Sequence, residues 1–111
     1  MARVFTVFRS RLRDEVSDEY RELASKLEHM ARQSPGFVDY RSLTAEDGEH
    51  LSVVVFETMA TQAAWRNDPE HRLAQQLARD RFYEWYEVSV CEEIRTSQWE
   101  RSPGRSRVEG R

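Results

Sequence analysis

Residues 37–57 read FVDYRSLTAEDGEHLSVVVFE and contain the clearest fold signal of the chain. Asp47-Gly48 stands between two stretches rich in β-branched and aromatic residues. Because Asp-Gly readily adopts the backbone of a tight hairpin turn, the stretch predicts two antiparallel strands, over residues 37–44 and 51–57.

Two further strands and two helical segments surround this hairpin. Side chains alternate with a period of two over residues 2–12 and 84–95, which predicts a strand at each place. From Ser17, which can cap it, onward apolar residues follow the spacing of a helix. After Thr58 a short helix precedes another that starts at Asp68-Pro69, and the apolar side of the latter is expected to consist of Leu73, Ala74, Leu77 and Ala78. This order predicts an α+β fold of the ferredoxin-like, split βαβ type with an antiparallel sheet.

Apolar side chains are expected on both faces of this sheet. Val53 and Val54 point to opposite faces of their strand, and Val7 and Phe8 have the same relation in the first strand. The helices can cover only one face, so the other is either solvated or buried against another protein surface. We expect a homodimer in which the uncovered sheet faces of two copies pack together.

Length and charge exclude several classes of protein. The chain has 111 residues and a formal net charge of −3, which predicts one domain over residues 1–100. Residues 101–111 contain four arginines and one glutamate and are expected to form a basic C-terminal tail. The acidic body argues against a nucleic-acid partner. No apolar run is long enough for a membrane helix and no signal-peptide pattern occurs, so we expect no membrane partner and a cytoplasmic location.

The sequence predicts no metal site and no cofactor. The three histidines and the single cysteine, Cys91, lack the spacing of metal ligands. Cys91 lies in an apolar strand and is expected to be an inert thiol in the core. The four glycines stand alone, so no glycine-rich loop is available to hold a phosphate.

Five stretches of the chain resemble the antibiotic biosynthesis monooxygenase (ABM) family. They are Val7-Phe8-Arg9-Ser10, Pro35-Gly36-Phe37, Glu46-Asp47-Gly48, Ala64-Trp65-Arg66-Asn67-Asp68-Pro69-Glu70-His71 and Arg81-Phe82-Tyr83-Glu84. The resemblance spans roughly residues 4–99 and implies a dimeric α+β barrel. It also implies an oxidoreductase, because the family includes cofactor-free oxygenases of polycyclic phenols, quinol oxygenases and haem-degrading enzymes.

The haem-degrading branch of the family is not expected here. Its members have Asn on the first strand and an iron-binding His about three turns after a helix Trp. This sequence has Trp65, but Ser10 and Gln75 stand at the other two positions. The resemblance instead favours a cofactor-independent monooxygenase acting on a small aromatic phenol or quinol. The alternative is a non-catalytic homodimer that binds a small aromatic molecule.

Trp65, His71 and Arg9 are the candidate catalytic residues. Trp65 and His71 lie where the two late helices meet, and the dipole at a helix N-terminus favours a neutral His71. With Arg9 from the first strand, they would donate hydrogen bonds to a phenolate-like anion. The structural alternative makes Trp65 a packing anchor and bonds His71 to a neighbouring carbonyl or to Asp68.

Four aromatic residues are expected to contact the substrate. They are Tyr40, Phe56, Tyr83 and Tyr86. A pocket with aromatic walls and a few polar groups suits a planar molecule. Phe56 stands where many relatives have Trp, which changes the shape of such a pocket.

Overall fold

Four long strands form one antiparallel sheet, and a separate two-stranded hairpin follows it. The structure, a computed structural model, describes residues 2–13, 17–102 and 105–109. In chain order the elements are β1 (Val4–Leu12), α1 (Asp18–Gln33), β2 (Phe37–Thr44), β3 (His50–Phe56), α2 (Met59–Arg66), α3 (Pro69–Arg81), β4 (Tyr83–Glu92), β5 (Gln98–Ser102) and β6 (Arg105–Glu109).

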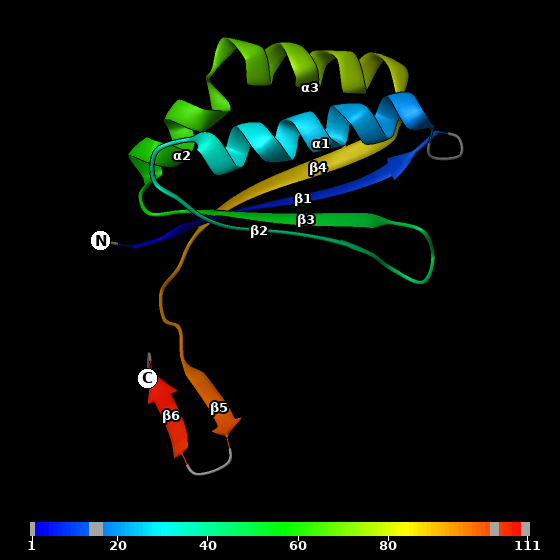
Figure 1. The fold of residues 1–111 in the computed structure, drawn as a ribbon. Helices are drawn as coiled ribbons and strands as arrows, with labels where there is room; N and C mark the ends of the chain where they lie inside the picture. Colours follow the sequence, from blue (N-terminus) through cyan, green and yellow to red (C-terminus); the bar gives the residue numbers. More distant parts are fainter. Residues whose placement is uncertain (1, 14–16, 103–104, 110–111) are drawn as a thin grey trace.

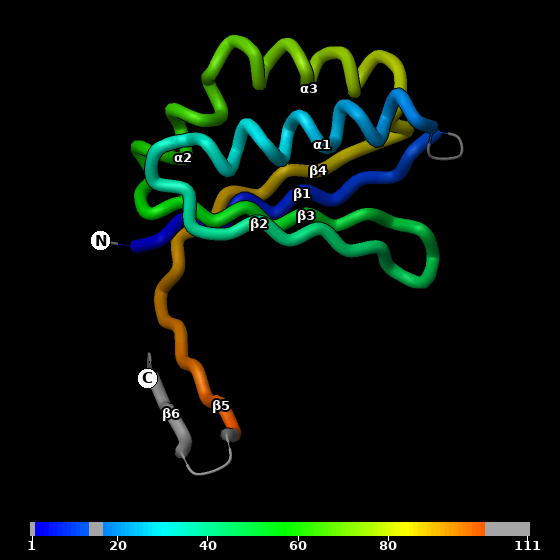
Figure 2. The backbone as a smooth tube through the Cα atoms, in the orientation of Figure 1, coloured from blue at the N-terminus to red at the C-terminus, as the bar shows by residue number. Residues whose placement is uncertain are grey.

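The main sheet has the strand order β2-β3-β1-β4, and each neighbouring pair is antiparallel. All three helices lie over the same face of this sheet (Figure 1). The α+β, ferredoxin-like prediction is therefore confirmed. Figure 2 shows that the turn between α2 and α3 lies at the end of the sheet where β1 begins.

Local sequence signals explain where the helices begin. The Ser17 hydroxyl accepts a hydrogen bond from the backbone N–H of Tyr20 at 3.1 Å and so caps α1. Thr58 and Thr61 form a capping box at the start of α2. These caps supply partners for backbone N–H groups that the first helical turn leaves free.

Gly36 connects the end of α1 to the start of β2 and packs against α2. Its φ of 82° lies in the left-handed region, which favours glycine. A Cβ at this position would lie 2.6 Å from the side chain of Thr61. Both the backbone conformation and the close approach therefore require glycine.

The hydrophobic core lies between the sheet and helices α1 and α2. Ala31, Val54, Phe56 and Trp65 form its buried cluster, and Phe37 and Tyr40 pack against it. Phe56 is fully buried, with 0% of its surface exposed. The core therefore fixes the position of Trp65 on α2.

Helix α3 is rotated relative to the prediction. The sequence pattern predicted an apolar side made of Leu73, Ala74, Leu77 and Ala78. In the structure Ala74 and Ala78 are buried, whereas Leu73 is 72% exposed and Leu77 is also exposed. The two alanines are small, so they can pack where the leucines would not fit, and the leucines turn outward.

The C-terminal part of the chain also differs from the prediction. Strand β4 ends at Glu92 rather than near residue 95, and Ile94 is 99% exposed in the segment that follows. Part of the predicted tail is paired: β5 and β6 form a hairpin that projects away from the main sheet (Figure 1). Residues 103, 104, 110 and 111 of that tail lie outside the described residues.

The sheet face opposite the helices has no covering element within the described part of the chain. Phe5, Val7 and Val53 are half-buried there, and Trp85 is exposed. Cys91, expected in the core, is exposed as well. Among the described residues no helix is long and apolar enough to cross a membrane.

Candidate functional site

A cavity of about 630 Å³ lies between the helices and the covered face of the sheet. All four strands of the main sheet and all three helices contribute side chains to its wall. The strand residues that line it have even numbers in β1, β2 and β3, including Thr6, Ser42 and Ser52, because alternate side chains point to the same face. The cavity has the size of a small-molecule site.

Trp65 and His71 meet at the corner between α2 and α3. Their ring centroids are 4.6 Å apart, and both side chains line the cavity. The Asp68 carboxylate accepts hydrogen bonds from the backbone N–H groups of Glu70 and His71, and Pro69 occupies the first turn. The α2–α3 turn therefore holds the two rings together, as the sequence predicted.

Phe56 supports this corner from beneath and does not line the cavity. Its ring stacks on Trp65 with a centroid distance of 5.1 Å and an interplanar angle of 29°. Phe56 is absent from the cavity wall because Trp65 lies over it. The expectation that Phe56 contacts the substrate directly is therefore corrected: it positions Trp65.

Three buried polar atoms at this end of the cavity have no hydrogen-bond partner among the described residues. They are Trp65 Nε1, His71 Nδ1 and Gln62 Oε1. The other end of the Gln62 amide is held, because Nε2 donates to Thr6 Oγ1 at 3.1 Å. A buried polar atom without a partner is costly, so this set can receive the polar groups of a ligand.

Burial lowers the pKa of His71 below its ordinary value of 6.5. The Arg66 main chain and the Asp68 charge oppose this shift only in part. His71 is therefore neutral at pH 7, as predicted, although burial is the main cause rather than the helix dipole. A neutral imidazole has one nitrogen that donates and one that accepts a hydrogen bond.

The other end of the cavity is aromatic. Tyr40, Tyr83 and Tyr86 line it as predicted, and Tyr20 from α1 joins them. Tyr83 and Tyr86 both pack against Phe8, with centroid distances of 5.5 and 5.3 Å.

Three of the tyrosines, Tyr20, Tyr40 and Tyr83, keep their phenolic hydrogens at neutral pH. Burial raises the pKa of Tyr20, Tyr40 and Tyr83 above the usual value of 10.0. Each side chain therefore offers an O–H group and an apolar ring to a ligand.

Arg9 does not join this site. Its side chain lies on the opposite face of the sheet, where Nε donates to Glu49 at 2.6 Å and Nη1 pairs with Glu87 at 3.6 Å. The guanidinium also lies 5.9 Å from the centre of the Trp85 ring. The expected position of Arg9 beneath Trp65 and His71 is wrong, because odd-numbered residues of β1 point away from the helices.

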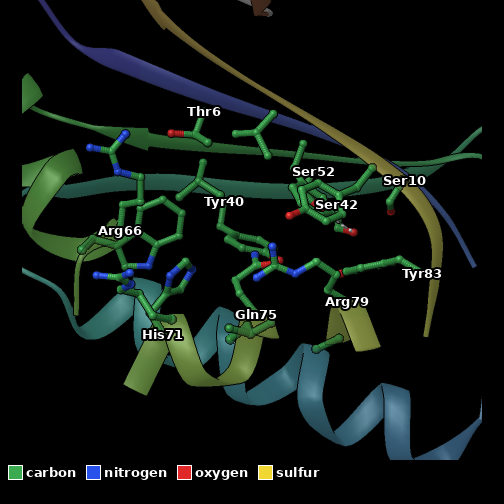
Figure 3. A pocket seen from close by; sticks show the side chains of 18 of the residues that line it. Thr6, Ser10, Tyr40, Ser42, Ser52, Arg66, His71, Gln75, Arg79 and Tyr83 are labelled. Atoms are coloured by element: carbon green, nitrogen blue, oxygen red, sulfur yellow. Dashed lines mark hydrogen bonds between the residues drawn. The ribbon is translucent and has the colours of Figure 1, made fainter. Parts of the chain in front are cut away.

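Sequence reasoning missed Gln62 and the cavity arginines. Gln62 precedes Trp65 by three positions on α2, so their side chains share a helix face, and this spacing was the available signal. Arg66, Arg72 and Arg79 also line the cavity. Figure 3 shows Arg66 and His71 toward one end, and Arg79 and Tyr83 toward the other.

No metal centre is formed by the side chains that the structure describes. Within residues 2–13 and 17–101, no group of three or more His, Cys, Asp or Glu is placed to hold a metal ion. The cavity offers hydrogen-bonding groups and aromatic surface, which suit an organic ligand with polar substituents.

The comparisons with known proteins agree with this fold. The family model described as antibiotic biosynthesis monooxygenase matches residues 3–77. The uncharacterised protein YqjZ of Bacillus subtilis is 30% identical over 87 residues, which are 78% of this chain and 76% of that protein.

Two solved structures are similar at low sequence identity. SnoaB, a cofactor-independent oxygenase from Streptomyces nogalater, has a TM-score of 0.74 and 15% identity, over 86% of this chain and 97% of that one. A dimeric ferredoxin-like protein of unknown function from Thermobifida fusca has a TM-score of 0.65 and 14% identity, over 83% and 92%. These likenesses show a shared fold. The match over residues 3–77 shows that the chain belongs to the antibiotic biosynthesis monooxygenase family.

Proposed function

We propose that this protein is a cofactor-independent monooxygenase that oxidises a small phenol or quinol in the cavity between helices and sheet. The observation that carries the proposal is the group of three unpartnered buried polar atoms, on Gln62, Trp65 and His71, beside an aromatic cavity. A substrate with a phenolic oxygen would satisfy such atoms, and their burial strengthens each hydrogen bond. The shared fold of SnoaB, itself a cofactor-independent oxygenase, supports the same activity.

The protein's part in the reaction is to stabilise an anion. Trp65 Nε1 donates a hydrogen bond to the substrate oxygen, and His71 Nδ1 accepts the phenolic proton. Because water is largely excluded around these groups, the resulting negative charge is stabilised more than it would be in solution. Gln62 Oε1 accepts a hydrogen bond from a second substrate hydroxyl when the substrate is a quinol.

The electrons then pass to dioxygen. The ionised ring reduces O₂, and one oxygen atom forms a new bond to a ring carbon. The hydrogen on that carbon leaves as a proton, the O–O bond breaks, and the second oxygen atom leaves as water. Phenol and O₂ thus give a quinone and one water molecule, with O₂ as the only oxidant.

Oxygen uptake tests this proposal. Protein dialysed against a chelator is mixed with a panel of anthrols, naphthols and quinols, and an oxygen electrode records consumption. We expect one O₂ to be consumed per quinone formed, without added flavin, haem or metal. Uptake that depends on an added cofactor contradicts cofactor independence. Binding of the panel without uptake identifies the protein as a non-catalytic binding protein instead.

We also propose that two copies pair through the uncovered sheet face. Phe5, Val7 and Val53 supply apolar surface there, and Arg9 is already neutralised by glutamates. The ion pairs reduce, without removing, the cost of taking the Arg9 charge out of water when the face is buried. The dimeric ferredoxin-like protein from Thermobifida fusca, which has the same fold, supports this assembly.

A further inference from the structure

Three arginines line the cavity, whereas no carboxylate among the described residues does. They are Arg66, Arg72 and Arg79. The whole chain has a formal net charge of −3, with 20 acidic residues. All three are exposed residues, so this positive charge lies where both solvent and the cavity can be reached, in a chain whose net charge is negative.

The arrangement of these arginines follows from the helices that carry them. Arg72, Gln75 and Arg79 are spaced i, i+3 and i+7 on α3, so their side chains form one polar stripe along the cavity. Arg66 is in the last turn of α2, beside the same corner. Figure 3 shows Arg79 extending from α3 into the space between the helices and the sheet.

The charges of these arginines are not neutralised by the part of the chain that the structure describes. The arginines elsewhere in the fold that form ion pairs include Arg3, Arg9, Arg11, Arg21, Arg32, Arg41 and Arg81. Arg66 and Arg72 form no ion pair with a described carboxylate. Arg79 Nη2 donates to the neutral Gln76 Oε1 at 2.7 Å, which leaves its charge uncompensated.

Arg72 occupies an unfavourable place for a cation. It lies near the start of α3, which begins at Pro69, and the positive end of the helix dipole is there. An anion bound in the cavity would offset this repulsion and accept hydrogen bonds from the guanidinium groups.

We propose that the ligand of this cavity is an aromatic organic anion, with its ring against the tyrosines and a carboxylate or similar oxyanion group held by Arg79, while Arg72 and Arg66 add positive charge farther along the wall (Figure 3). This proposal rests on the proposed function, since it takes the cavity as the substrate site, and it narrows the substrate to acidic phenols. The arginines face a hollow of small-molecule size, which favours a small anion over a nucleic acid.

Two probes that differ in charge test the proposal. Isothermal titration calorimetry compares 3-hydroxy-2-naphthoate with its neutral amide, 3-hydroxy-2-naphthamide. We expect the carboxylate to bind about tenfold or more tightly, because hydrogen bonds between ionised groups are stronger than those of a neutral amide. Added salt should weaken the binding of the carboxylate and leave that of the amide unchanged.

Two variants, each lacking one arginine, then test which positive charge binds the carboxylate. Arg79→Gln should weaken the binding of the carboxylate about tenfold without affecting the binding of the amide. Arg21→Gln removes the same charge from an exposed arginine paired with Asp18 on α1, and should change neither. If the unmodified protein binds the two probes equally, the anion proposal is wrong. The proposed function is then still tested by the oxygen-uptake assay. If neither probe binds, both the anion proposal and the use of this cavity for phenols are wrong.

Discussion

Gln62 Nε2 donates a hydrogen bond to Thr6 Oγ1 at 3.1 Å, and both side chains are buried. The bond ties α2 to β1 across 56 positions of sequence. It also orients the amide so that its oxygen remains without a partner among the described residues. Gln62 therefore fixes the helix on the sheet and presents an acceptor at the cavity.

The first prediction concerns this bond. Gln62→Met keeps the length of the side chain but removes the amide, so the free energy of unfolding should fall by about 1–3 kcal/mol, as for a buried polar group that loses its partner. Urea denaturation measures the loss. In a Thr6→Val background the same change should cost less, and an equal loss in both backgrounds would contradict the coupling.

The second prediction compares two of the tryptophans, Trp65 on the side of the sheet that the helices cover and Trp85 on the opposite face. Trp65→Phe retains the stacking on Phe56 but removes the indole N–H, so turnover should fall about 10–1000-fold. Trp85→Phe is the matched control and should leave turnover unchanged. Turnover is measured by oxygen uptake, alongside thermal melts. A lowered Tm with unchanged turnover would restrict Trp65 to a packing role.

The third prediction follows from the lowered pKa of His71. Well above pH 6.5 the imidazole is neutral in both the folded and the unfolded chain, so it makes no pH-dependent contribution to stability. As the pH falls below 6.5, the unfolded chain binds a proton that the folded chain resists, and stability decreases until the lowered pKa is passed.

His71→Gln lacks this titrating group, so its Tm should decline less than that of the unmodified protein between about pH 7.5 and about pH 5.5. The other histidines, His29 and His50, are present in both proteins and cancel in the comparison. If the Tm of the two proteins falls equally with decreasing pH, the fold does not hold His71 neutral.

The fourth prediction is that Arg9 is dispensable for chemistry. Arg9→Gln removes the ion pairs with Glu49 and Glu87 on the face away from the cavity, so turnover per folded protein should not change. Steady-state oxygen uptake checks this. A loss of turnover as large as that of Trp65→Phe would mean that Arg9 reaches a site other than the one described.

The fifth prediction is that the protein forms a dimer in solution. Sedimentation equilibrium should give about twice the chain mass of 13.2 kDa. Val7→Glu places a charge on the uncovered sheet face and should shift the protein toward the monomer, whereas Leu73→Glu on the outward side of α3 should not. A monomeric mass for the unmodified protein would exclude pairing through this face.

Much of the fold was predictable because its signals are local. The Asp47-Gly48 turn, the Ser17 cap and the Asp68-Pro69 helix start each depend on a few neighbouring residues, and all three occur in the structure. The hairpin of β5 and β6 was not predicted, because arginine-rich sequence has neither strong alternation nor a core to pack on. The rotation of α3 depends on which side chains fit at its contacts, and a helical pattern alone does not determine this.

The site was predictable only in part. Trp65 and His71 meet as expected because one short turn sets their separation, whereas Arg9 was misplaced despite the correct strand. Its odd-numbered position in β1 placed it on the face opposite Phe8 and Ser10, and that parity was already readable in the sequence. Gln62 was missed because the partner that buries it, Thr6, is remote in the chain.

Gly36 restricts the position of α2, and so of the corner where Trp65 and His71 meet, although Gly36 lies outside that corner. Any side chain here would press on Thr61, which belongs to the capping box of α2, and α2 carries both Gln62 and Trp65. A substitution at Gly36 would thus tilt or shift that helix and misalign the two residues together, although Gly36 itself does not line the cavity. The turn after α1 therefore limits the shape of the cavity at a distance, because the absence of a side chain at Gly36 sets where α2 lies.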